Sequence, residues 1–102
     1  AIPFLAAGGH GCISVTANIA PKMCADMQNA WADGDVADAM ALQSKLMPVH
    51  GALFCETSPG PVKYAAGLLG ICADETRLPM TEIAEVSKAR VRDAIQGAGI
   101  TR

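Results

Sequence analysis

Lysine is the first side chain to consider in this 102-residue sequence, because a lysine amine can hold a carbonyl substrate as a Schiff base. Such a lysine needs a lowered pKa, which burial or a neighbouring positive charge provides. All four lysines fall in segments that we predict to be helical, where a solvated face is their usual setting: Lys22, Lys45, Lys63 and Lys88. Lys63 has the least ordinary surroundings because it follows Pro61-Val62, but its spacing does not indicate a buried amine. The lysine positions therefore nominate no catalytic residue.

A serine nucleophile would need a histidine base and an acid that orients the histidine. Ser14 is the only serine in the β-branched run from Cys12 to Thr16, and no G-x-S-x-G motif surrounds it. Neither His10 nor His50 has an acid at a recognisable spacing. We interpret His50 as a packed or capping histidine, and we favour a structural role for His10 as well. Hydrolase chemistry is therefore not expected.

The run Gly8-Gly9-His10-Gly11 suggests a phosphate-binding loop but does not match the dinucleotide fingerprint. That fingerprint requires a glycine where this sequence has Ser14, and it follows a strand, whereas these glycines precede one. We interpret the glycines as a helix stop and a tight entry into the next element. The acidic pairs also have ordinary explanations, since Asp74-Glu75 falls in a loop and Glu82 and Glu85 complement a helix dipole. No cofactor is expected.

The four cysteines are widely spread and contain no C-x-x-C pair: Cys12, Cys24, Cys55 and Cys72. Zinc sites usually pair their ligands at short spacing, and the two histidines are also far apart, so no metal site is expected. Because the cysteines fall within apolar stretches, we expect reduced thiols that pack as small buried hydrophobes. Reduced thiols are typical of the cytoplasm, and we predict a soluble, cytoplasmic protein.

Composition and length exclude several classes of protein. A formal net charge of −2 argues against nucleic-acid binding, which favours a clustered basic face. The start lacks the basic region of a signal peptide, and the longest apolar stretch, 12–20, is interrupted by polar residues, so no membrane association is expected. A length of 102 residues allows one domain but not a complete (β/α)₈ barrel of about 250 residues. The 51% hydrophobic content suggests a surface meant for a partner.

Start and stop signals predict five helical segments. The first, 1–7, ends before Gly8-Gly9, and the second starts at Pro21 and ends at Gly34. Asp35 is the predicted N-cap of a third helix, with Asp38 in its first turn. The fourth helix follows the connector 57–61, with Pro61 near its first position and Gly70 at its end; the fifth is capped by Thr81 and closed by Gly97 and Gly99.

The apolar residues of three predicted helices indicate which faces are buried. The second helix presents Met23, Met27, Ala30 and Trp31 at helical spacing; the third, Val36, Ala39, Met40, Leu46, Met47, Leu53 and Phe54; the fifth, Ile83, Val86, Val91, Ala94, Ile95 and Ala98. Pro48 falls inside the third helix and is expected to kink it near 43–47.

A single strand is predicted over Cys12 to Thr16, which is short, β-branched and flanked by turn signals. A lone strand exposes unpaired N–H and C=O groups on both edges. The sequence offers no second convincing strand, so we expect this one to need strands that the 102 residues do not contain.

The order of these segments resembles dihydrodipicolinate synthases of the pyruvate-dependent lyase superfamily, which also contains N-acetylneuraminate lyase. The runs that carry the resemblance are collinear: 8–21 resembles the eighth barrel strand and its flanks, and 46–50, 58–64 and 77–81 resemble the C-terminal helices. Arg77-Leu78-Pro79 and Gly9-His10-Gly11-Cys12-Ile13-Ser14 favour the dihydrodipicolinate branch. Gly60 departs from the family, which usually has a larger apolar residue there, and this departure is expected to loosen the connector.

The resemblance implies the fold class of an α/β parent, a TIM barrel (β/α)₈. This chain would supply the last βα unit over 1–34 and a mostly α-helical C-terminal domain over 35–102. The implied parent is a cytoplasmic homotetramer that uses no cofactor. It would condense pyruvate with aspartate 4-semialdehyde, through a lysine Schiff base, in lysine and diaminopimelate biosynthesis.

The resemblance also implies which residues take part. The family's catalytic lysine and tyrosine would lie upstream of Ala1, and Tyr64 is not that tyrosine. Ile13 is the one family site residue that maps onto this chain, where it would contact pyruvate and shape the pocket. The chain alone is then expected to be inactive. Two alternatives are another pyruvate-dependent aldolase and a self-associating helical module without catalysis.

Overall fold

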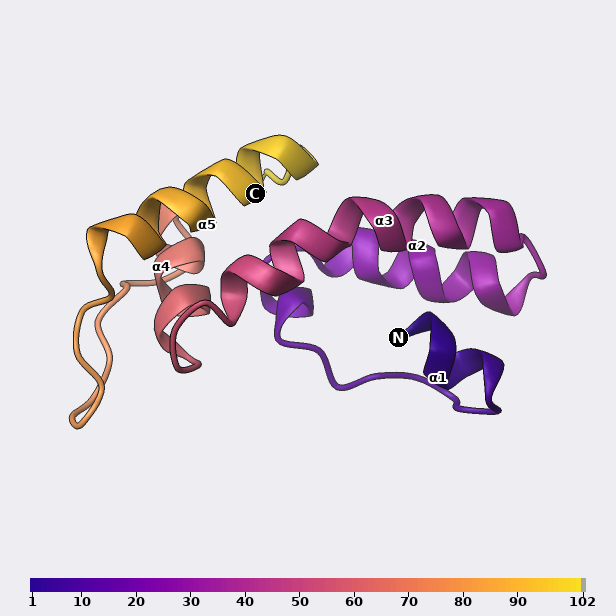
Figure 1. Cartoon of the computed structure of the whole chain (residues 1–102), viewed down its shortest axis with the longest axis horizontal. Helices are drawn as coiled ribbons and strands as arrows, with labels where there is room; N and C mark the ends of the chain where they lie inside the picture. Colours follow the sequence, from indigo (N-terminus) through magenta and orange to yellow (C-terminus); the bar gives the residue numbers. More distant parts are fainter. Residues whose placement is uncertain (102) are drawn as a thin grey trace.

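The computed structural model describes residues 1–101, which form an elongated helical body of 42 × 25 × 21 Å (Figure 1). The elements in order are α1 (Ile2–Ala6), the 3₁₀ turn η1 (Thr16–Asn18), α2 (Pro21–Ala32), α3 (Val36–Leu53), α4 (Gly60–Leu68) and α5 (Glu85–Ala98). In Figure 1, α2 and the first half of α3 lie side by side with α1 beneath them, and α4 and α5 lie at the other end of α3. No helix in the described part of the chain is long and apolar enough to cross a membrane.

The ends of α2, α3 and α5 confirm the local signals. Pro21 is the first residue of α2, and its missing N–H costs nothing at that position. The Asp35 carboxylate accepts the Asp38 N–H at 3.0 Å and so caps α3. Gly99 ends α5 in the left-handed conformation with φ 67°, which a side chain would disfavour. α3 continues through Pro48.

The predicted strand over 12–16 is wrong for this chain. Cys12 and Ile13 lie in an irregular segment, and Thr16 starts η1. The β-branched side chains favour extended backbone, but a strand requires hydrogen bonds from a second strand, and residues 1–101 contain none. Without a partner, the backbone turns at Val15 into a short hydrogen-bonded helix instead, where the Ile19 N–H donates to the Thr16 carbonyl at 3.0 Å.

Two hydrophobic clusters share α3. The C-terminal cluster joins η1 and α3 to α4 and α5: Ile19, Ala20, Val49, Ala52, Leu53, Val62, Ala65, Ala66, Val91, Ile95, Ala98 and Ile100. The N-terminal cluster joins α1, α2 and α3 as far as Leu46: Ile2, Leu5, Met27, Ala30, Ala39 and Leu46. The predicted face of α2 is confirmed, because Met27 and Ala30 are buried and Met23 and Trp31 pack against the N-terminal cluster.

The predicted apolar face of α3 is only half right. Ala39, Leu46 and Leu53, spaced by seven residues, are fully buried. The other four predicted core residues are exposed instead: Val36, Met40, Met47 and Phe54. These four follow one another at intervals of four and seven residues, so they line one side of the helix. We call them the exposed stripe of α3.

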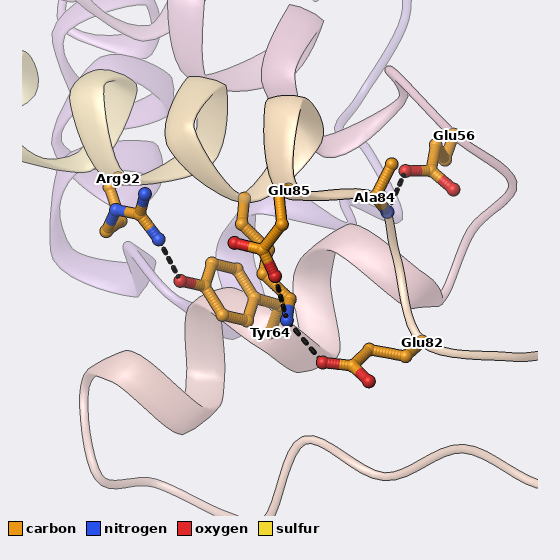
Figure 2. A network of polar contacts seen from close by, with 7 residues as sticks. Glu56, Tyr64, Glu82, Ala84, Glu85 and Arg92 are labelled. Atoms are coloured by element: carbon orange, nitrogen blue, oxygen red, sulfur yellow. Dashed lines mark hydrogen bonds and ion pairs between the residues drawn. The ribbon is translucent and has the colours of Figure 1, made fainter.

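The start of α5 also differs from the prediction. The helix begins at Glu85, and its N-cap is Ala84 rather than Thr81. The Ala84 N–H is satisfied from far along the chain, since it donates to the Glu56 carboxylate at 2.8 Å (Figure 2). This start places Ser87 on the buried face and Val86 on the exposed face, at 77% exposure. Val91, Ile95 and Ala98 are buried as predicted, and Ala94 is partly buried.

Gly60, where the family usually has a larger residue, does not leave a gap. It is buried at the first position of α4, and a Cβ there would lie 2.9 Å from the Cγ2 atom of Ile83. Ile83 therefore occupies the space that a side chain at residue 60 would take. The connector is filled rather than loosened, contrary to the expectation from the sequence.

Candidate functional site

Ile13, the one predicted site residue, lies at a cleft near the middle of the chain. Its side chain is fully exposed, at 107% of the reference area. The cleft encloses about 480 Å³ and is lined by residues 12–17 together with side chains of α2 and α3. Ser14 and His50 line it too, whereas the other candidates, His10 and Lys63, do not. The structure therefore brings Ile13, Ser14 and His50 together from two distant parts of the sequence.

Side-chain hydrogen bonds hold the turn that follows Ile13. Ser14 Oγ accepts the Ala17 N–H at 3.2 Å, as a capping serine does at a helix start. The Asn18 side-chain amide donates to the Val15 carbonyl at 3.0 Å. These two local bonds fix the turn between residues 14 and 18 without a neighbouring strand.

A third bond ties the same turn to α3. Thr16 Oγ1 lies 2.6 Å from His50 Nδ1, and Thr16 is buried, at 1% exposure. Burial lowers the pKa of His50, and the positive charge of the Ala1 amino group lowers it further. The neutral imidazole is therefore favoured, which suits a hydrogen bond with a hydroxyl in a half-buried place. The structure thus identifies Thr16 as the residue with which His50, predicted to pack or cap, interacts.

Cys24 also faces this cleft, and its environment keeps it a thiol. Burial raises its pKa, a hydrogen bond with Ser14 acts in the opposite direction, and the nearby Cys12 raises it again. A thiol with a raised pKa is a poor nucleophile and metal ligand.

The expectation that all four cysteines are buried is wrong, because Cys12 and Cys72 are exposed and Cys24 and Cys55 are half-buried. No group of three metal-ligating side chains exists within 1–101.

A second polar cluster lies between α4, α5 and the segment before α5 (Figure 2). Lys88 forms ion pairs with Glu82 and Glu85, and its ammonium lies 5.8 Å from the centre of the Tyr64 ring. Arg92 donates to the Tyr64 hydroxyl at 2.7 Å. A cavity of about 330 Å³ lies beside Lys88 and Tyr64.

The charges of this cluster stabilise one another. The hydrogen bond and charge of Lys88 lower the pKa of Glu82, and the two glutamates raise the pKa of Lys88 far above its usual range. Hydrogen bonds from Ser87 and the Ala84 N–H lower the pKa of Glu56. Lys88 therefore stays protonated and cannot act as a Schiff-base nucleophile.

The remaining lysines agree with the prediction that none is a buried amine. Lys22 and Lys45 are exposed, and Lys22 pairs with Asp26 at 2.6 Å. Lys63 is half-buried on α4.

Thr16 is the residue that sequence reasoning missed as part of the site. It was assigned to a strand, and its partner His50 is 34 residues away, so no local pattern could reveal the bond.

The comparison with protein families decides which proteins this chain is related to. Residues 1–98 match the model of the dihydrodipicolinate synthetase family. The chain belongs to this family. It is 62% identical over 99 residues to the 4-hydroxy-tetrahydrodipicolinate synthase of Gluconacetobacter diazotrophicus, covering 97% of this chain and 33% of that protein. It is 57% identical to the synthase of Acidiphilium cryptum, covering 98% of this chain and 34% of that protein.

Solved dihydrodipicolinate synthases share the backbone arrangement. A monomeric dihydrodipicolinate synthase variant superposes with a TM-score of 0.93 at 36% identity, covering 96% of this chain and 33% of that one. The chloride-inhibited enzyme of Acinetobacter baumannii, solved in complex with pyruvate, gives a TM-score of 0.85 at 41% identity, covering 91% of this chain and 32% of that one. The chain thus spans about a third of the length of the relatives it matches, and it corresponds to their C-terminal portion.

Proposed function

We propose that this chain supplies the C-terminal portion of a 4-hydroxy-tetrahydrodipicolinate synthase. The parent enzyme would condense pyruvate with aspartate 4-semialdehyde in lysine and diaminopimelate biosynthesis, with pyruvate held as a lysine Schiff base and without an external cofactor. The observation that carries the proposal is the 62% identity to such a synthase over 97% of this chain. As the family resemblance implies, the parent would be a cytoplasmic homotetramer.

Ile13 is the residue through which the chain would reach the substrate. Its side chain is fully exposed at the cleft, and a TIM barrel builds its pocket from residues at the C-terminal ends of its strands. In the proposed parent, residues 12–16 pair with neighbouring strands, and Ile13 lies against pyruvate. An aliphatic side chain contributes shape and excludes water, but it moves no proton.

The proposal assigns the proton transfers and the Schiff base to residues outside this chain. Its four lysines are exposed, half-buried or ion-paired, so none has the desolvated amine that the chemistry needs. We therefore expect the 102-residue chain alone to be inactive. Borohydride reduction in the presence of pyruvate should leave its mass unchanged, and a pyruvyl adduct at stoichiometric yield would contradict this assignment.

A chimera tests the function itself. The matching third of the Gluconacetobacter diazotrophicus synthase is replaced by this chain, of which 99 residues align with it. We expect the chimera to condense pyruvate with aspartate 4-semialdehyde at a rate within about tenfold of the parent, because the two sequences preserve the same packing. A folded chimera that is inactive would refute the proposal. Activity restricted to another aldehyde would instead favour a different pyruvate-dependent aldolase.

The exposed stripe of α3 favours a second candidate, a helical module that associates with copies of itself. Four large apolar side chains, each about half exposed, line one side of this helix, as they would at an interaction surface. Light scattering with dye binding separates the two functions. A clean monomer without dye binding would exclude the module, whereas discrete oligomers of the chain together with an inactive chimera would support it.

A further inference from the structure

Within residues 1–101, the position of Ile13 depends on the turn that follows it, and in the proposed parent neighbouring strands would support the same segment. The backbone between Gly9 and Val15 is irregular, and η1 begins only at Thr16. Ile13 is fully exposed in this chain, so no packing within residues 1–101 fixes it. What fixes the segment is the turn at residues 14–18, where Ala17 donates to Ser14 Oγ and Asn18 donates to Val15. Any contact that moves this turn therefore moves Ile13.

Two side-chain contacts tie the turn to other elements: Ser14 contacts Cys24 on α2, and Thr16 bonds to His50 on α3. The Thr16–His50 distance of 2.6 Å indicates a strong bond, and the Thr16 hydroxyl is removed from water. A buried hydroxyl without a partner is unfavourable, so the loss of the imidazole would force Thr16 to move or to find another acceptor.

His50 is well placed to hold the turn because its own backbone is rigid. It lies in the last turns of α3, beside Val49 and close to Leu53, both of which are completely buried in the C-terminal cluster. A side chain on such a helix presents its ring nitrogen at a defined place. Thr16 and Ile13 are three residues apart, at most about 11 Å along the backbone. A displacement of the turn therefore also displaces Ile13.

We propose that His50 is a positioning residue: through its hydrogen bond to Thr16 it sets the place of Ile13 at the pyruvate pocket. The proposal rests on the proposed function, because it takes Ile13 to contact pyruvate. His50 itself touches no reacting atom in this account. Its effect is on how well the pocket holds pyruvate rather than on the chemical step.

Three substitutions separate the hydrogen bond from the bulk of the ring. Asparagine carries a polar atom at the same distance from Cβ as His50 Nδ1, so His50→Asn keeps the bond to Thr16. His50→Leu has a similar branched shape and cannot form it. Thr16→Val removes the hydroxyl from the other side with almost no change in volume. His10→Asn is the matched control, because His10 is the other histidine, is exposed and does not line the cleft.

The first experiment measures hydrogen exchange of the Ala17 and Asn18 amides in the 102-residue chain, without any need for activity. The backbone amide of Ala17 donates to Ser14 Oγ, and the backbone amide of Asn18 donates to the Val15 carbonyl at 3.1 Å. We expect His50→Leu and Thr16→Val to speed their exchange about tenfold, the factor that one lost hydrogen bond is worth, and His50→Asn and His10→Asn to leave it unchanged. Unchanged exchange in the leucine and valine variants would overturn the proposal. If His50→Leu fails to fold, Thr16→Val decides.

The second experiment measures steady-state kinetics of the same variants in the chimera. We expect the KM for pyruvate to rise about tenfold in His50→Leu and Thr16→Val while kcat changes by less than about twofold, and His50→Asn to restore KM. A loosened turn with an unchanged KM would overturn the positioning role, as would equal losses in His50→Asn. An inactive wild-type chimera would refute the proposed function instead, while the exchange data would still test the bond between His50 and the turn.

Discussion

Two regions of α3, before and after Pro48, differ in how completely the chain covers them. After Pro48, Val49 and Leu53 are entirely buried against α4 and α5. Before Pro48, Leu46 is just as buried on one side, but Met40 and Met47 remain about half exposed on another side. The difference shows that a helix buried on one face can still expose apolar side chains on another face. Along α3, the residues that face α4 and α5 are covered by this chain, whereas Met40 and Met47 form part of a surface suited to a neighbour.

Polar contacts follow the same division. At the C-terminal end, Lys88, Glu82 and Tyr64 satisfy one another within a single cluster. Near Ile13, two separate contacts link the turn to other helices, the Thr16–His50 bond to α3 and the Ser14 contact with Cys24 on α2. A cluster in which several groups share partners tolerates the loss of one contact better than separate contacts do. Mutations should therefore affect the two regions in different ways.

The largest effect is expected from the C-terminal cluster. Leu53→Ala removes a completely buried side chain, and we expect it to lower the free energy of unfolding by about 3 kcal/mol because it leaves a cavity. Met47→Ala on the same helix removes an exposed side chain and should change the free energy of unfolding by less than about 0.5 kcal/mol. Urea denaturation followed by circular dichroism measures both. Equal losses would show that the exposed stripe is covered in solution.

The next effect concerns Ile13, where function and stability should separate. Ile13→Ala is expected to raise the KM for pyruvate of the chimera about tenfold, because a few methyl groups in a pocket are worth 1–3 kcal/mol. The free energy of unfolding of the chain alone should change by less than about 0.5 kcal/mol, since Ile13 is fully exposed there. Ile71→Ala, also exposed but away from the cleft, is the control for the KM. A destabilised chain would mean that Ile13 packs against other residues of this chain.

A smaller effect is expected from the protonation of His50. Because its folded pKa lies below the ordinary 6.5, the unfolded chain binds the proton at higher pH than the folded chain does. The free energy of unfolding should therefore be greatest above about pH 7 and should fall as the pH decreases through 6.5. Urea denaturation at about pH 7.5 and 5.5 tests this, since carboxylates titrate mainly below that window. His50→Asn should reduce the difference in the free energy of unfolding between the two pH values. An unchanged difference would mean that other groups cause it.

The smallest effect is expected from the exposed ion pairs of Lys88. Lys88→Met should lower the thermal midpoint by less than Leu53→Ala does, because Glu82 and Glu85 are solvent-exposed partners. The difference from the wild type should shrink further in about 1 M salt, which screens exposed charges over a few ångströms. The pairing is also pH-dependent. The lowered pKa of Glu82 contributes stability above about pH 4.5 that is lost on acidification, and the raised pKa of Lys88 contributes stability below about pH 10.5. An effect independent of salt would indicate that packing of the lysine stem matters more than its charge.

Local sequence signals predicted the helix ends that depend on interactions within one turn of the chain. Pro21 starts α2, Asp35 caps α3 and Gly99 ends α5, because each of these residues acts on backbone groups within one turn of itself. The start of α5 was missed for the opposite reason. Ala84 has no capping side chain, and its N–H is satisfied by Glu56, 28 residues away.

The candidate site divides in the same way. Ile13 was nominated through its place in a family motif and does line the cleft, but its assignment to a strand assumed partners that residues 1–101 do not provide. The bond between Thr16 and His50 could not be predicted at all, since neither residue signals the other along the sequence. Long-range contacts of this kind follow from the packing of α3, not from any local pattern.

The continuity of α3 has a consequence for how the molecule folds. Leu46 belongs to the N-terminal cluster, and Val49, less than one turn later, belongs to the C-terminal cluster. The same helical hydrogen bonds therefore serve both clusters, and fraying of α3 in one region withdraws support from the other. The segment from Leu46 to Val49 therefore couples the two clusters, together with Met23 of α2, which packs against both of them.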